Sequence, residues 1–358
     1  MNSLKSLVER GEEECTHLVA LNLGGYLVHF KTNSMPLIAE LTDYYQFFLA
    51  NEEQQNQTPD KIVTGLQCLA QEITGDWQVK QPDPGKLKIK EHILDVDGGK
   101  LIYKVLTGLH LLFKGSERFC FGPLEDHPNQ VVNFINNMHL EHLLLPGGQL
   151  FHASGASLGN NGLGMAGLSG KGKSTLALRL LQRGMDLVSN DRLVVSEQAS
   201  GLLMQGITKY PRINPGTVIN QPELADIVSE ENLARYNAMT FDELWMLEEK
   251  YDAFVEPAFG CRFNLNAKMR MFVALDWDRN SSAPLKLEQR DPRDCVALVK
   301  NIMKSPGIML PEASKRIPEA VVEPYLDLLS HCDFYVLSGK VDFDQAADEI
   351  KAIVQKYV

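Results

Sequence analysis

The sequence predicts an α/β protein of two domains, a strand-rich α+β module over residues 1–128 and an α/β domain over residues 129–358. Three observations support this fold class. The chain has 358 residues, more than one domain of roughly 100–200 residues needs. Residues 77–121 consist of short apolar and polar runs separated by turns, which is typical of strands. Residues 163–184 place a glycine-rich loop between a strand-like run and an amphipathic helix.

The N-terminal module is expected to begin with a short charged helix and a hairpin of two strands around Gly24 and Gly25. A helix is predicted to start near Ser34, and the polar tract 51–60 is predicted to be a loop. Further strands are predicted over residues 87–90, 93–96, 101–105, 111–113 and 119–121. This pattern predicts an antiparallel sheet without a chemical motif of its own.

The C-terminal domain is expected to open with a helix over residues 133–145 and a hairpin whose strands cover 150–158 and 163–166, with His152 on the first strand. A helix over 175–183 follows the glycine-rich loop. The later elements are predicted in this order: strands over 186–195 and 202–204, a loop over 206–216, helices over 222–228 and 240–250, a strand over 271–275, helices over 295–303 and 318–329, a strand over 334–337 and a helix from 343.

The glycine-rich loop reads Gly-Leu-Ser-Gly-Lys-Gly-Lys-Ser from Gly167 to Ser174, which is the spacing of a P-loop. Glycines bend such a loop so that backbone N–H groups point at phosphates, while Lys173 reaches the outer oxygens and the Ser174 hydroxyl ligates Mg²⁺. The helix start that follows adds about half a positive charge. The loop therefore predicts a site for ATP and Mg²⁺ made by Gly167, Ser169, Gly170, Lys171, Gly172, Lys173, Ser174 and Thr175.

Polar residues follow the next apolar run, where Asn190 and Asp191 come after Val188. Open α/β sheets place ligand contacts at the carboxyl ends of their strands. Asp191 is therefore predicted to hold Mg²⁺ opposite Ser174, directly or through water. The alternative is that Asp191 only forms a turn.

The predicted loop over residues 206–216 carries two cations, Lys209 and Arg212. Cations on such a loop can clamp a phosphoryl group during transfer. Ordinary solvated positions explain the two residues equally well.

The composition excludes several classes of partner. The formal net charge is −11 and the isoelectric point is near 5.4, which argues against a nucleic-acid partner. The six cysteines are scattered without a close pair, so no zinc site or disulfide framework is suggested. The N-terminus lacks the apolar core of a signal peptide, and no run of apolar residues is long enough for a membrane span. We therefore expect a cytoplasmic protein without a membrane partner.

The run from His152 to Arg192 resembles the catalytic core of the HPr kinase/phosphorylase family, whose P-loop domain is of the phosphoenolpyruvate-carboxykinase-like type. In that family a histidine precedes the first P-loop glycine by fifteen residues, and here 167 − 152 = 15. The helix after the P-loop also ends in Arg-Gly, and Asn190 and Asp191 stand where the family has two aspartates. A weaker resemblance extends to Tyr210-Pro211-Arg212 and to residues 334–343.

The resemblance implies an ATP-dependent kinase that transfers the γ-phosphoryl group to a hydroxyl of an unidentified acceptor, either a small molecule or a protein. Its catalytic residues would be His152, Asn190, Asp191 and Arg212. In the family the first acid of the pair is thought to be the general base, but the Asn190 amide cannot take up a proton at neutral pH. His152 is therefore the predicted base or orienting group. The family's later Glu-Ile-Arg-Gly segment is replaced here by Leu-Met-Gln-Gly over residues 203–206.

Two other functions are left open by the sequence. The first is a pseudokinase that senses ATP and switches a partner without phosphoryl transfer, which Asn190 favours. The second is a plain ATPase or GTPase, which is disfavoured because the chain has no guanine-reading Asn-Lys-x-Asp and no clear strand ending in Asp-Glu. A homo-oligomer is also left open, as is the role of residues 1–128.

Overall fold

The computed structural model describes residues 2–82, 88–168, 170–240, 243–244, 247, 249–316 and 320–358. The chain forms two compact units, Met1–His139 with Met309–Pro311 and Leu140–Ile308 with Glu312–Val358. The predicted boundary at residue 128 coincides with the start of helix α4 (Pro128–Leu144), and the last residues of α4 belong to the second unit. Within the described ranges no helix is both long enough and apolar enough to cross a bilayer. The predicted α/β class is confirmed, with several sheets.

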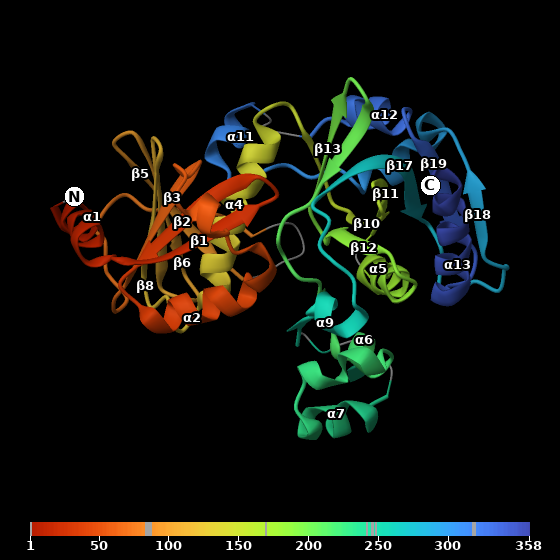
Figure 1. The fold of residues 1–358 in the computed structure, drawn as a ribbon, viewed down its shortest axis with the longest axis horizontal. Helices are drawn as coiled ribbons and strands as arrows, with labels where there is room; N and C mark the ends of the chain where they lie inside the picture. Colours follow the sequence, from red (N-terminus) through yellow and green to blue (C-terminus); the bar gives the residue numbers. More distant parts are fainter. Residues whose placement is uncertain are drawn as a thin grey trace. The chain divides into compact units, whose positions relative to one another are not determined.

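The first unit is built on an eight-stranded sheet, shown with its helices in Figure 1. In spatial order the strands are β1 (His17–Leu23), β2 (Tyr26–Thr32), β3 (Lys61–Gln67), β8 (Glu117–Gly122), β7 (Leu109–Lys114), β6 (Gly99–Lys104), β5 (Glu91–Val96) and β4 (Gln78–Val79). The predicted hairpin around Gly24 and Gly25 is confirmed as β1 and β2. The antiparallel pairing predicted from the strands of residues 77–121 is confirmed for β4 to β8. The sheet as a whole is mixed, because β3 pairs in parallel with both β2 and β8.

Strand β3 was not predicted, because its Gly65 weakens a strand pattern. In the fold Gly65 is needed for close packing, since an added Cβ would lie 2.5 Å from the Phe30 ring. Two other expectations also differ. The tract 51–60 contains a short helix, α3 (Glu52–Gln55), and residues 88–90 form no strand, while residue 87 of that predicted strand lies outside the described residues.

Helices cover both faces of this sheet. Leu112 of β7 shares a core with Leu7 of α1 (Asn2–Glu14). The next residue, Phe113, points to the opposite face, where its ring meets Phe134 of α4 edge-on at 5.3 Å. This alternation is the period of a strand with both faces buried. Helix α2 (Met35–Tyr44) packs on β1 and β2, and the 3₁₀ turn η1 (Gln46–Phe48) follows it.

The second unit is built on a nine-stranded sheet. Its strands are β9 (Gln149–Phe151), β10 (Ser154–Leu158), β11 (Asn161–Gly167), β12 (Asp186–Ser189), β13 (Leu193–Gln198), β14 (Gly201–Gln205), β17 (Asn266–Leu275), β18 (Lys286–Gln289) and β19 (Asp333–Ser338). The central strands β11, β17 and β19 are parallel, with Gly167 opposite Leu275 and Leu275 opposite Leu337. The loops after these three strands therefore leave from one edge of the sheet, where α/β proteins bind ligands.

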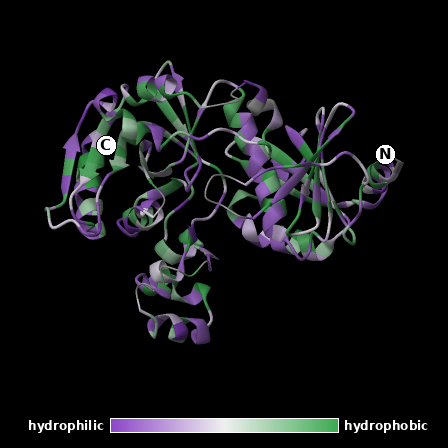
Figure 2. Ribbon diagram, turned by 180° about the vertical axis from the view of Figure 1, so that it is seen from behind, coloured by the Kyte–Doolittle hydropathy of each residue, from purple (hydrophilic) through white to green (hydrophobic). Residues whose placement is uncertain are grey.

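Two helical layers enclose the sheet of the second unit (Figure 1). Met271 and Val273 of β17 pack against α5 (Lys173–Gln182) and α13 (Phe343–Val354). Phe272 and Ala274 point the other way, toward α10 (Val296–Lys300) and α12 (Val322–Leu329). Figure 2 shows hydrophobic and hydrophilic residues side by side along the helices, as expected for helices with one buried face. The remaining short elements are η3 (Pro292–Cys295), α11 (Pro311–Arg316) and η4 (Gln355–Tyr357).

Two predicted strands are each broken in the fold. The predicted strand over 150–158 is interrupted at His152 and Ala153, so His152 lies between β9 and β10 and not on a strand. The strand over 186–195, which the polar residues 189–191 were expected to interrupt, is broken at residues 190–192. Both breaks have one cause, because β9 pairs with β13 whereas β10 pairs with β12. At each break the chain leaves one pair of strands and enters the other pair. His152 and Asp191 lie in these two breaks and contact each other.

The described residues between 206 and 263 form a lobe at one end of this unit (Figure 1), and we call them the lobe. Its elements are β15 (Arg212–Ile213), α6 (Pro215–Ile219), the 3₁₀ helix η2 (Pro222–Ile227), α7 (Glu230–Asn237), β16 (Tyr251–Asp252) and α9 (Val255–Phe259). Helix α7 was not predicted. The capping box of Thr240 and Glu243 is confirmed, although much of the predicted helix 240–250 lies outside the described residues. Residues 318 and 319 of the predicted helix 318–329 also lie outside the described residues. The described part of that helix is α12, which begins at Val322.

Candidate active site

A cleft of ≈ 1270 Å³ lies at the carboxyl edge of the parallel strands. The P-loop, the turn at Asn190 and Asp191, the lobe and the segments after β17 and β19 all line it. Among the described lining residues there are seven cations and two acids, namely Lys171, Lys173, Arg179, Lys209, Arg212, Lys250 and Arg279 against Asp191 and Asp278. The cleft thus has the opposite charge balance to the chain as a whole, which contains 35 lysines and arginines and 46 aspartates and glutamates.

The P-loop connects β11 to α5, as predicted. Gly170 and Gly172 have φ values of 82° and 81°, a region that side chains other than glycine seldom adopt. At Gly172 there is also no room, because an added Cβ would lie 2.6 Å from the Phe343 ring. Helix α5 begins at Lys173, so its first N–H groups face the loop. Ser169, which the sequence assigns to the same site, lies outside the described residues.

The two P-loop lysines have different partners. Lys173 Nζ donates to the Gly167 carbonyl at 2.7 Å. Burial lowers the pKa of Lys173, and the Lys304 charge acts in the same direction against the opposing effect of Asp191. Lys171 Nζ instead donates to the Trp277 carbonyl at 2.7 Å, and Trp277 Nε1 donates back to the Lys171 carbonyl at 2.8 Å. Lys171 therefore ties the P-loop to the segment after β17, while the Lys173 ammonium stays on the Gly167 carbonyl at the start of the loop.

Asn190 connects the P-loop helix to the sheet. Its Oδ1 accepts hydrogen bonds from Ser174 Oγ at 3.0 Å and from Ser154 Oγ at 3.1 Å, and the residue is buried. Because the Ser174 hydroxyl hydrogen points at Asn190, the lone pairs of Ser174 Oγ are left for a cation. The structure thus brings Ser174 together with Asn190, whereas Asp191 has other partners. Thr175 lines the same cleft.

Asp191 is the only described non-glycine residue with a positive φ, at 69°. Such a conformation is uncommon and often marks a functional site. His152 Nε2 donates to its Oδ1 at 2.9 Å, and Lys304 Nζ contacts its Oδ2 at 3.1 Å. Burial alone would raise the pKa of Asp191, but the His152 hydrogen bond and the Lys304 charge outweigh it and hold the pKa below its ordinary value. Asp191 is therefore ionised at neutral pH.

Lys304 is a site residue that the sequence analysis missed. It lies in an irregular segment after α10, and this segment is fixed beside His152 because the His152 N–H donates to the Ile302 carbonyl at 2.7 Å. Tyr325 Oη donates to the Leu150 carbonyl at 2.7 Å, and the Lys304 N–H lies 3.4 Å from the same Tyr325 oxygen. The sequence around Lys304 carries no motif. Its role in the site follows only from the fold, which brings Lys304 next to Asp191, 113 residues earlier in the chain.

Lys209 and Arg212 reach the cleft from the lobe. Arg212 is in β15 opposite Asp252 of β16, and its Nε lies 3.5 Å from Asp252 Oδ1. Burial lowers the pKa of Lys209 to about 8, and the charge of Arg192 acts in the same direction. Both cations singled out by the sequence thus line the cleft that contains the P-loop.

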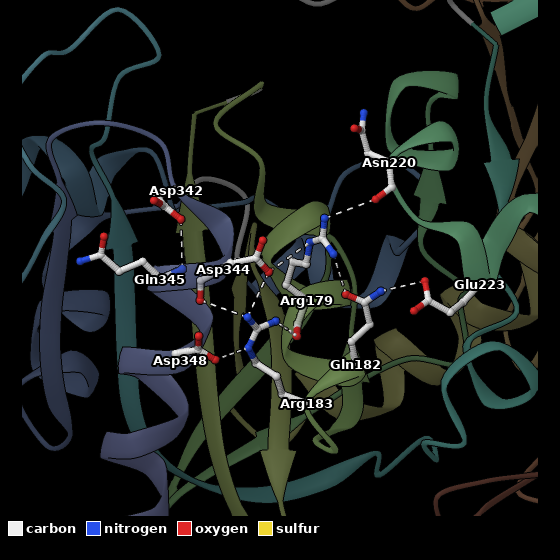
Figure 3. Close-up of polar contacts among 9 residues, drawn as sticks. All are labelled: Arg179, Gln182, Arg183, Asn220, Glu223, Asp342, Asp344, Gln345 and Asp348. Carbon is white, nitrogen blue, oxygen red and sulfur yellow. Dashed lines mark hydrogen bonds and ion pairs between the residues drawn. The ribbon is translucent and has the colours of Figure 1, made fainter. Parts of the chain in front are cut away.

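Arginines on α5 link this helix to its neighbours, as Figure 3 shows. Arg179 donates to the Asn220 carbonyl of the lobe at 3.3 Å and lies 3.9 Å from Asp344 of α13. Arg183 donates to Asp348 at 2.5 Å and to Asp344 at 3.0 Å. The helix that follows the P-loop is therefore held on one side by α13 and on the other by the lobe.

We expect Arg183→Ala to lower the free energy of unfolding by about 1 kcal/mol, because its partners Asp344 and Asp348 are largely exposed and such pairs stabilise weakly. Urea denaturation followed by circular dichroism measures the change. The matched control is Arg293→Ala, whose ion pairs are exposed at both ends and whose effect should be smaller. An equal loss in both variants would contradict a specific contribution of Arg183.

The residues fit a magnesium–nucleotide complex. In the described ranges no three His, Cys, Asp or Glu side chains are grouped to hold a metal ion. Mg²⁺ that enters with a nucleotide keeps several waters and needs only one or two protein ligands besides phosphate oxygens. The Ser174 hydroxyl and the Asn190 and Asp191 oxygens are the nearby groups of the required chemistry.

Comparison with known proteins adds little to this geometry. No family model matches the chain, and no characterised protein matches its sequence. Among solved structures, the Hpr(Ser) kinase/phosphatase from Coxiella burnetii is 13% identical, and the match covers 58% of this chain and 95% of that chain with a TM-score of 0.28. A likeness at this level does not establish function, so the proposal below rests on the residues of the cleft.

Proposed function

We propose that the protein is an ATP-dependent kinase that transfers the γ-phosphoryl group to a hydroxyl. The observation that carries this proposal is that the His152–Asp191 pair and the P-loop lysine Lys173 line one cleft. A P-loop alone would suit any nucleotide-binding protein. An imidazole held by a carboxylate beside it supplies the proton acceptor that transfer to a hydroxyl uses.

The cleft residues divide into three roles. The backbone of the P-loop and Lys173 would bind the phosphates, and Ser174 and Asp191 would hold Mg²⁺, which neutralises charge on the β- and γ-phosphates. His152 would accept the proton of the acceptor hydroxyl. Its Nε2 donates to Asp191, so in the neutral ring Nδ1 carries the lone pair. Phosphoryl transfer depends mainly on positioning and charge, so these groups suffice.

One observation favours a second function, an ATP-binding pseudokinase. Asn190 stands where the resembled family has an acid, and its amide oxygen is already engaged by two serine hydroxyls. A site without a competent base would bind ATP and change a partner's state without transfer.

A product-resolved assay with γ-labelled ATP tests the proposal. The purified protein is incubated with Mg²⁺ and fractionated cell extract, and the label is followed into inorganic phosphate and into other products. Label in a new phosphate ester that depends on Lys173 supports the kinase. Release as inorganic phosphate alone indicates an ATPase, and ATP binding without release indicates the pseudokinase.

Lys173→Ala is expected to weaken ATP binding by at least about tenfold, or roughly 1.4 kcal/mol, because its ammonium offsets charge on the outer phosphates. Calorimetry in Mg²⁺ buffer measures the affinity. The control is Lys286→Ala on the exposed strand β18, which should bind ATP like the wild type. Unchanged affinity in Lys173→Ala would remove the P-loop assignment.

A further inference from the structure

We propose that the acceptor of this transfer carries an anionic group, a phosphate or a carboxylate, and that Lys209, Arg212 and Lys250 of the lobe bind it. The inference rests on the proposed kinase function and names the class of its substrate. It starts from the cationic lining of a cleft in an acidic chain. More cations line this cleft than a nucleotide site built from P-loop backbone and Lys173 requires.

The cations fall into two groups on the basis of the charges that act on them. The charges of Asp191 and Lys304 act on the pKa of Lys173. The charges that act on the pKa of Lys209 are those of Arg192, Asp191, Arg212 and Asp252. The Asp191 charge acts on both lysines, and all three residues line the same cleft, so the candidate catalytic pair is close to the P-loop cation and to the cations of the lobe.

That arrangement assigns a side to each substrate. The attacking oxygen and the leaving oxygen lie roughly in line through the transferred phosphoryl group. A base must also be within hydrogen-bond reach of the acceptor hydroxyl. If the nucleotide phosphates lie on the P-loop side of the His152–Asp191 pair, the acceptor lies on the lobe side, beside Lys209 and Arg212.

Local structure fixes the lobe cations at this position. Tyr210 lies between Lys209 and Arg212 in the sequence, and its side chain is buried. The Tyr210 ring packs on the Phe254 ring, with 4.7 Å between the ring centroids. Strands β15 and β16 pair Arg212 with Asp252, and Lys250 directly precedes β16. These two short strands and the residues beside them therefore bring Lys209, Arg212 and Lys250 to the cleft.

The electrostatics favour an anionic ligand at this point. Keeping Lys209 charged is costly, because burial and the neighbouring Arg192 and Arg212 charges all lower its pKa. An anion would offset this cost, whereas a neutral polyol or a basic peptide would leave it in place. The same wall contains Gln221, which is fully buried and, within the described residues, has no hydrogen-bond partner for either amide atom. A ligand with hydroxyl groups would satisfy it.

The experiment uses the full chain saturated with Mg²⁺ and the non-hydrolysable analogue AMP-PNP, so that the P-loop is filled. Sulfate and acetate are then titrated, and binding is measured by calorimetry. We expect one anion site that Lys209→Gln and Arg212→Gln each weaken by at least about tenfold. AMP-PNP affinity should stay within about twofold in both variants. Lys209→Arg should retain the anion site, because it keeps the charge. Lys286→Gln is the matched surface control.

Each outcome has a defined reading. Binding of sulfate alone indicates a phosphate-bearing acceptor, and binding of acetate as well indicates that a carboxylate is accepted. Absence of an anion site on the nucleotide-loaded protein overturns the acceptor class and leaves the kinase proposal standing. If Lys209→Gln weakens AMP-PNP binding as much as anion binding, the lobe cations bind the nucleotide, and the proposed acceptor class is overturned. Failure of AMP-PNP to bind the wild type overturns the kinase proposal and this inference with it.

Discussion

His152→Gln is expected to lower the rate of phosphoryl transfer by about 10²–10⁴-fold while ATP binding survives. The glutamine amide can still donate to Asp191, but it offers no basic nitrogen to the acceptor hydroxyl. The loss should therefore appear in the transfer step. The γ-labelled ATP assay at saturating ATP measures the rate, and calorimetry measures the ATP affinity.

The matched control for this experiment is His331→Gln, because the His331 side chain is 55% exposed and its partner Glu197 lies in β13. It should transfer phosphate like the wild type. Equal transfer by wild type and His152→Gln would remove His152 from the mechanism and leave Asp191 as the remaining candidate base. A wild-type protein that binds ATP without any transfer would favour the pseudokinase.

The strand, glycine-rich loop and helix around Gly167 to Ser174 were predictable because their signal is local. The strand before Gly167, the loop and helix α5 are consecutive in the sequence, so spacing and composition are enough to recognise them. The pairing of His152 with Asp191 was only partly predictable. Both residues were singled out, and polar Ser189, Asn190 and Asp191 indicated the interruption of the second strand. The break at His152 and Ala153 was not predicted, because no glycine or proline marks it. Only the pairing of β9 with β13 and of β10 with β12 explains those breaks.

Lys304 and the mixed sheet of the first unit show where sequence reasoning fails. A lone lysine in an irregular segment has no recognisable spacing, and its partner Asp191 is 113 residues away. Strand β3 contains Gly65, whose small size is required by Phe30 on the neighbouring strand. In both cases the determinant is a contact with a distant part of the chain, which a local pattern does not contain.

Asp191→Asn is expected to lower the transfer rate by roughly 10²–10⁴-fold, because the orientation of the proposed base His152 depends on this carboxylate. In the wild type one carboxylate oxygen accepts from His152 and the other contacts Lys304. An amide has a single oxygen for these two donors, and its NH₂ group would face one of them. The variant therefore loses either the hold on His152 or the neutralisation of Lys304. The γ-labelled ATP assay measures the rate.

The same variant also tests the metal role predicted for Asp191 with Ser174. If Asp191 helps to hold Mg²⁺, the gain in ATP affinity on adding Mg²⁺ should shrink. Metal-free ATP binding should not weaken, because a negative charge near the phosphates has been removed. Calorimetry with and without Mg²⁺ separates the two affinities, and the exposed Asp226→Asn in η2 controls for loss of an acid elsewhere. An equal fall in ATP affinity under both conditions would instead give Asp191 a structural role, consistent with its positive φ at the turn between β12 and β13.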